Sequence, residues 1–236
     1  MLCRVGDPPA LIVTADDYGY SRNYDRGILE AARAGALDAV SAMVLREGCD
    51  PEPLLETEVE VGLHLELPGW RGNLLHHAGP GHREDAIAAL SDQLRRFGEL
   101  FGRPPAHLDG HHHCHAAPGV AVAVGGVARE HRLPVRSVNA RHRRLLRCQG
   151  IPTPDRLVGR LDEDEPALPP EIRAVARGEG ELPPGVTEWM VHPGRSDPAS
   201  GSGYDRGRAE ELGLLLSLSL APPLAAVRTT HLAAFG

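Results

Sequence analysis

Two adjacent carboxylates, Asp16 and Asp17, stand directly after a short apolar run at residues 10–15 (ALIVTA). The run is rich in β-branched residues, which is typical of a buried parallel strand. Neighbouring side chains on a strand point in opposite directions, so both carboxylates reach one site only where the chain turns. They could then take different roles there, such as metal binding and general base catalysis. A helix-capping aspartate in an ordinary turn is the alternative that the pair alone leaves open.

Five of the 13 histidines fall within the segment HLDGHHHCH. If the segment is extended, alternation places one set of side chains on one side: His107, Asp109, His111, His113 and His115. Imidazoles two residues apart can converge on a metal ion, and Asp109 could fix the tautomer of a histidine. His111 and His113 are both candidate ligands on this evidence. A polar loop without a metal is the alternative.

Two further histidines stand near the ends of apolar segments. His64 lies in VGLHLEL, where alternation gives it the same face as Gly62 and Glu66. His192 lies in WMVHPG, directly before Pro-Gly, and a histidine there could act as a general acid near neutral pH. Each could instead be a structural histidine, so neither decides the function by itself.

These residues need a scaffold, and the rest of the chain predicts strands alternating with helices. The predicted strands are residues 10–15, 38–45, 59–67, 107–109, 134–138, 187–192 and 227–232. The predicted helices are residues 23–34, 83–101, 118–131, 170–178 and 204–218. Residues 68–82 read as a loop, and the rest of 150–185 reads as irregular surface structure.

Strands that alternate with helices imply a parallel sheet with right-handed crossovers. We therefore expect an α/β fold, an irregular or incomplete (β/α) barrel formed by residues 1–236 as a single domain. In such barrels the chemistry lies at the C-terminal ends of the strands. The Asp16-Asp17 pair, His64, the histidine-rich segment and His192 all fall at such ends, which predicts that they share one site.

Bulk properties exclude several classes of function. The formal net charge of −7 with neutral histidines argues against nucleic acid binding. The basic run at residues 141–147 reads as a solvated face, and a rim that attracts an anionic substrate is the alternative. The four cysteines include no CxxC pair, so neither a zinc ribbon nor a redox motif is supported. Without a signal peptide or a membrane-spanning stretch in the sequence, we expect a cytoplasmic protein.

The motifs in series resemble those of the YdjC-like (ChbG-type) carbohydrate deacetylase family. The segments that carry the resemblance are TADDYGYSRNYDRGILEAARAG, VGLHLEL, HLDGHHHCHAAPGV, EWMVHPG and a later pattern of Tyr204, Arg208 and Glu211. The resemblance spans nearly the whole chain and implies an irregular (β/α) barrel. It also implies one divalent metal ion and removal of acetyl groups from N-acetylated sugars such as chitooligosaccharides. Tyr18 and Gly110 depart from the commoner Phe and Ser, and neither departure removes a proposed ligand.

Carried over motif by motif, the resemblance implies a role for each site residue. Asp17, His64 and His111 would bind the metal, Asp16 would be the catalytic base and His192 the candidate acid. The metal could be magnesium or zinc, and the histidine-rich ligands also suit nickel.

Other readings stay open at this point. A different barrel metallohydrolase, such as a phosphoesterase or cyclic amidohydrolase, is the main alternative. A non-catalytic metal-binding protein is a second. The expected partner is a small N-acetylated sugar, with no nucleic acid and no membrane, and the sequence leaves open whether the chain forms a homodimer.

Overall fold

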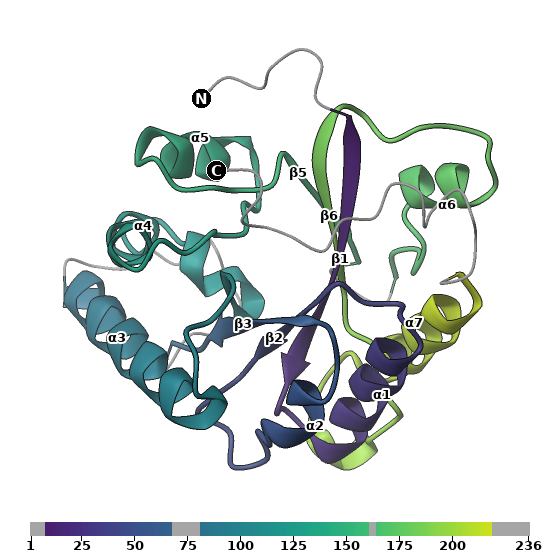
Figure 1. Ribbon diagram of the computed structural model, residues 1–236, viewed down its shortest axis with the longest axis horizontal. Coiled ribbons are helices and arrows are strands. Elements are labelled where there is room, and N and C mark those ends of the chain that lie inside the picture. Colours follow the sequence, from purple (N-terminus) through teal and green to yellow (C-terminus); the bar gives the residue numbers. More distant parts are fainter. Residues whose placement is uncertain (1–7, 68–80, 161–163, 219–236) are drawn as a thin grey trace.

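The computed structural model describes residues 8–67, 81–160 and 164–218. Within them, parallel strands form one sheet in the order β4-β3-β2-β1-β6-β5. The strands are β1 (Pro9–Tyr18), β2 (Ala39–Ala42), β3 (Glu60–Leu65), β4 (Leu108–Gly110), β5 (Arg156–Gly159) and β6 (Gly185–Val191). They curl into an incomplete (β/α) barrel, as Figure 1 shows, which confirms the predicted fold class.

Helices cover the outside of the curled sheet. They are α1 (Arg22–Arg33), α2 (Glu52–Leu55), α3 (Gly81–Phe101), α4 (Ala121–Glu130), α5 (Ala140–Cys148), α6 (Pro170–Ala176) and α7 (Asp205–Leu218). Two 3-10 helices, η1 (His111–Ala116) and η2 (Pro198–Ser200), follow β4 and β6. In Figure 1, α3, α4 and α5 lie on one side of the sheet, and α1 packs beside α7 on the other. None of the described helices is long and apolar enough to cross a membrane.

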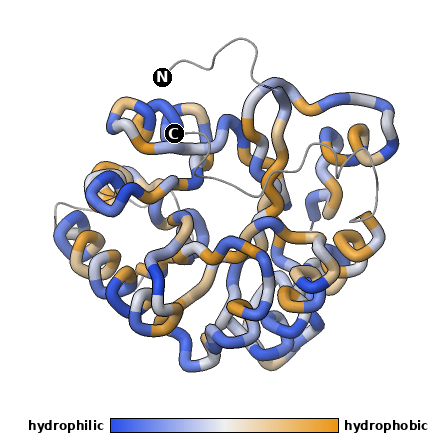
Figure 2. Tube along the Cα trace, viewed as in Figure 1, coloured by the Kyte–Doolittle hydropathy of each residue, from blue (hydrophilic) through white to orange (hydrophobic). Residues whose placement is uncertain are grey.

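The centre of the sheet is apolar because β1 is buried on both faces. Leu11, Ile12 and Val13 are at most 1% exposed, and β1 lies between β2 and β6. Such a run of apolar residues is expected for a strand covered on both sides. Figure 2 shows both hydrophobic and hydrophilic segments along the outer helices, as expected for helices that bury one face.

Helix α1 spans Arg22–Arg33, within one residue at each end of the helix predicted at 23–34. Ser21 caps α1, because its hydroxyl accepts a hydrogen bond from the backbone N–H of Tyr24 at 3.3 Å. Gly35, just past the helix, has φ of +69°, a conformation that favours glycine. These two residues therefore mark the start and the end of α1.

One predicted strand is wrong, and another was missed. Residues 134–138 make only an isolated bridge, Leu108 to Val135, instead of a strand. The proline at 134 has no N–H to donate to a ladder, which limits pairing there. The missed strand is β5, which lies in a stretch that the sequence predicted to be irregular. The predicted strand at 227–232 and residues 68–80 of the loop predicted at 68–82 lie outside the described residues.

Candidate metal centre

An irregularity near the end of β1 brings both carboxylates of the Asp16-Asp17 pair to one pocket. Pairing between β1 and β2 is regular up to Ala15 and shifts register before Tyr18. Within this irregularity Asp17 has φ of +70°, a left-handed conformation that aspartate tolerates better than most residues. The distortion removes the strict alternation of a strand, so Asp16 and Asp17 both line the same pocket of about 540 Å³.

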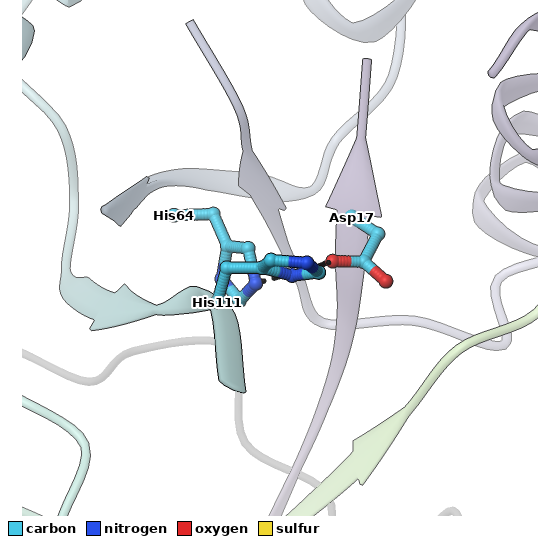
Figure 3. Close-up of side chains that lie close together, drawn as sticks. All are labelled: Asp17, His64 and His111. Atoms are coloured by element: carbon cyan, nitrogen blue, oxygen red, sulfur yellow. Dashed lines mark hydrogen bonds and ion pairs between the residues drawn. The ribbon is translucent and has the colours of Figure 1, made fainter. Parts of the chain in front are cut away.

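Asp17, His64 and His111 converge in this pocket from three separate segments of the chain. The Oδ1 atom of Asp17 lies 3.2 Å from Nε2 of His64 and 2.9 Å from Nδ1 of His111. Each residue offers one ligand atom, and these atoms all lie within 4.8 Å of one another. Figure 3 shows both rings directed toward the same carboxylate. Two imidazoles and one carboxylate are a common ligand set for a catalytic metal that keeps a position open.

Asp109 fixes the orientation of His64. Its Oδ1 atom lies 2.7 Å from Nδ1 of His64, which leaves Nε2 facing Asp17. Carboxylates commonly hold the second nitrogen of a metal-binding histidine in this way. Although burial opposes a charge on His64, Asp109 and Asp16 raise its pKa well above the usual value. The site therefore favours positive charge, which fits a metal ion.

Arg136 joins three buried carboxylates behind this site. It donates to both oxygens of Asp16 at 2.6 and 2.8 Å and to Glu188 at 2.8 Å, and its Nη2 atom forms an ion pair with Asp109 at 2.8 Å. Burial opposes the ionised form of Asp109, yet Arg136 and His64 hold its pKa below the usual range. Asp16, His64 and Asp109 form a second group that could hold a metal. Arg136 occupies both oxygens of Asp16, whereas Arg208 takes only Oδ2 of Asp17 and leaves Oδ1 facing the two histidines, so the Asp17 group is the better candidate.

The histidine-rich segment is extended only as far as Gly110. Beyond it η1 begins, and His112 and His113 have positive φ, so the predicted alternation from His107 to His115 is wrong. The turn separates the histidines: His111 faces Asp17, whereas His115 is buried and bonds the carbonyl of Arg136 at 3.1 Å. His113 lines the pocket but belongs to neither group of candidate ligands.

His192 directly follows β6 and lines the same pocket. Its backbone N–H donates to Glu211, and its ring packs edge-on against Tyr204 with centroids 5.3 Å apart. Burial lowers the pKa of His192 to about 4, so the ring is neutral at pH 7. The sequence predicted an acid that titrates near neutral pH, and the buried position changes that expectation.

Comparison with known proteins identifies the family of this chain. A family profile described as YdjC-like protein matches residues 10–226. The chain belongs to the YdjC-like family. A carbohydrate deacetylase from Geobacillus stearothermophilus is 32% identical over 239 residues, covering 92% of this chain and 94% of that protein. A chitooligosaccharide deacetylase from Proteus mirabilis (strain HI4320) is 32% identical over 241 residues, covering 91% and 93% respectively.

The YdjC-like chain also resembles a solved structure. The crystal structure of an Enterococcus faecalis V583 protein, named for cellobiose-phosphate cleavage, aligns with a TM-score of 0.75. The alignment covers 96% of this chain and 98% of that one at 23% identity. At this identity the likeness supports the fold alone.

Sequence reasoning gave no site role to the buried arginines of this YdjC-like protein. Arg136 lies in a short segment between two helices, and Arg208 comes from α7, where its Nη2 atom donates to Oδ2 of Asp17 at 2.5 Å. Although burial opposes ionisation of Asp17, Arg208, His111 and His64 hold its pKa well below the usual value. Arg208 belongs to the Tyr204, Arg208 and Glu211 pattern, which gave it no role, and Arg136 belongs to no recognisable spacing, so only the tertiary structure reveals these pairs.

Proposed function

We propose that this chain is a metal-dependent hydrolase that removes the acetyl group from an N-acetylated sugar. The observation that carries the proposal is the convergence of Asp17, His64 and His111, with Asp16 lining the same pocket. The family and the deacetylase names of its relatives support an acetylated carbohydrate as the substrate. A chitooligosaccharide or another compound that contains N-acetylglucosamine is the proposed substrate class.

Asp17, His64 and His111 would hold one divalent metal ion. Two histidines favour zinc or a similar transition metal, and magnesium is the alternative among hard cations. A metal bound there would lower the pKa of a water molecule and polarise the amide carbonyl. The remaining chemistry falls to side chains of the protein.

Asp16 is the proposed general base, which takes a proton as water attacks the acetyl carbon. Its two oxygens accept hydrogen bonds from Arg136, and this pairing fixes the direction of the carboxylate. Each carboxylate oxygen has a second lone pair, so Asp16 can still accept a proton. A base held in one orientation loses little entropy when it acts.

His192 is the proposed general acid. A bond forms between the water oxygen and the acetyl carbon, and the C–N bond then breaks to give acetate and a free amine. The departing nitrogen needs a proton, and His192 is neutral at pH 7 because burial lowers its pKa to about 4. His192 must therefore gain a proton during the reaction. Asp16, which lines the same pocket, is the proposed source.

Acetate release from a panel of N-acetylglucosamine compounds tests the proposal, with and without a chelator and with zinc or magnesium restored. Asp16→Asn should retain zinc and lose acetate release, and substantial activity in that variant would contradict the base assignment. Release of phosphate from phosphate esters, with no acetate from any N-acetyl sugar, would favour a different metallohydrolase.

A further inference from the structure

Arg208 is a buried cation at the edge of the proposed metal centre. Its side chain is 3% exposed and lines the pocket. Its guanidinium carbon lies 4.2 Å from the ring centre of Tyr24, 5.7 Å from that of Tyr20 and 5.9 Å from that of Tyr204. Aromatic faces attract a guanidinium, so the three rings hold its position and its charge.

Only part of the hydrogen-bonding capacity of Arg208 is used. Its Nη2 atom donates to Oδ2 of Asp17 at 2.5 Å. Its Nε and Nη1 atoms are buried and have no hydrogen-bond partner in the part of the chain that the structure describes. Buried donors are rarely left without an acceptor, and donors on a charged group are the most costly to leave so. Arg208 is one of the residues that line the pocket, so an acceptor bound there would lie next to this side chain.

The position of Arg208 relative to Asp17 indicates which kind of acceptor its unpaired donors could bind. Asp17 directs Oδ1 toward His64 and His111, and Oδ2 toward Arg208. The guanidinium thus lies one hydrogen bond from the carboxylate at the proposed metal centre. In the proposed hydrolysis, the acetyl oxygen gains negative charge as water attacks. Preorganised donors directed at such an oxygen lower the barrier to the reaction.

We propose that Arg208 contacts the substrate and binds the acetyl oxygen through one of its unpaired guanidinium donors. This inference rests on the proposed function and adds a residue to it. A role limited to holding Asp17 would use Nη2 alone and would leave the other buried donors unexplained. The unpaired donors therefore favour substrate binding over a role in which Arg208 only positions Asp17.

Arg208→Lys separates the two roles, because lysine keeps the positive charge beside Asp17 but loses the planar array of donors. Two quantities are measured on the zinc-loaded protein: the rate of acetate release, and the affinity for methylphosphonate by calorimetry. Methylphosphonate has a methyl group and negatively charged tetrahedral oxygens. Zinc affinity is measured separately by competition with a chromophoric chelator. Arg206→Lys, at an exposed position of the same helix, is the matched control.

In Arg208→Lys we expect kcat/KM to fall by about 100-fold at saturating zinc, as when one oxyanion donor is removed. Methylphosphonate binding should weaken by about 10-fold or more, whereas zinc affinity should stay close to that of the wild type. Arg206→Lys should match the wild type in all three measurements.

Two results would overturn the inference. One is that Arg208→Lys binds methylphosphonate as tightly as the wild type does. The other is that Arg208→Met regains the full wild-type rate of acetate release at high zinc concentration. That result would mean that Arg208 only positions Asp17. If the wild type releases no acetate but binds methylphosphonate in an Arg208-dependent way, the proposed deacetylation fails while the oxygen-binding role of Arg208 stands.

Discussion

The guanidinium of Arg136 donates one hydrogen bond to each oxygen of Asp16, at 2.6 and 2.8 Å, with both side chains at most 2% exposed. Planar, two-point pairing of this kind fixes a carboxylate more strictly than a single contact can. It gives Asp16 a different environment from Asp17, which faces two histidines and Arg208. The adjacent aspartates therefore suit different roles.

Loss of Arg136 should destabilise the protein and abolish activity. In Arg136→Gln, Asp16, Asp109 and Glu188 lose a shared buried cation. Removing one partner of a buried ion pair typically costs about 3–5 kcal/mol of unfolding free energy. Urea unfolding of the metal-free protein measures this cost. Arg136→Lys should recover part of the stability but little of the activity, since it loses the two-point contact. Equal activity in Arg136→Lys and the wild type would argue against orientation of Asp16 as the role of this arginine.

Asp109→Asn should weaken metal binding. The change removes the negative charge next to Nδ1 of His64. Losing the carboxylate that supports a ligating histidine typically lowers metal affinity about 10- to 100-fold. Titration of the metal-free variant against a chromophoric chelator gives the zinc Kd. Ser41→Ala is the control, because Ser41 donates to Asp109 at 2.7 Å but makes no side-chain hydrogen bond to Asp17, His64 or His111. A zinc Kd in Asp109→Asn equal to that of Ser41→Ala would contradict this role.

Gly27→Ala should reduce activity by displacing the loop after His192. A Cβ atom at Gly27 would lie 2.6 Å from the Cα atom of Gly194, closer than any real contact. Because the obstruction is backbone, the loop must shift, and His192 would move with it. We expect kcat to fall by about 10-fold or more, since small misplacements of catalytic groups are costly. Gly98→Ala is the matched control in α3, where nothing lies within 4 Å, and it should be neutral or slightly stabilising. An unchanged kcat in Gly27→Ala would mean that the loop tolerates the shift.

The stability of the metal-free protein should fall on mild acidification, in part because of His142. Burial lowers the pKa of His142 to about 4, below its ordinary value of 6.5. The folded protein therefore keeps this ring neutral, whereas the unfolded chain protonates it below pH 6.5. The contribution of neutral His142 to the free energy of unfolding is therefore complete above that pH and is lost as the pH falls toward 4.

Urea unfolding of wild type and His142→Gln from about pH 7 to about pH 5 tests this linkage. The free energy of unfolding should fall less steeply with acid in His142→Gln. The comparison is of slopes, so any constant cost of the substitution cancels. Parallel slopes in the two proteins would show that His142 does not carry the expected part of the acid sensitivity.

Local patterns predicted most of the helices and strands well. The apolar run before Asp16 became the central strand β1, and the helix after it begins at its serine cap. Errors arose where pairing depends on distant partners. Residues 134–138 resemble a strand but form only one bridge, while β5 finds its partner in β6, a strand that follows it in the chain. Hydrogen bonding to another segment decides both cases, and no local pattern reports it.

The sequence by itself placed Asp16, Asp17, His64, His111 and His192 at strand ends, and in a parallel sheet those ends meet at one edge. Tertiary structure decided which of these side chains contact one another at that edge. The left-handed backbone of Asp17 turns its carboxylate to the histidines, and a 3-10 turn after Gly110 selects His111 from the histidine run. Arg136 and Arg208 reach the two aspartates from far along the chain. Such long-range pairing depends on how the helices and loops pack, because burial makes each carboxylate require a cation that no local motif supplies.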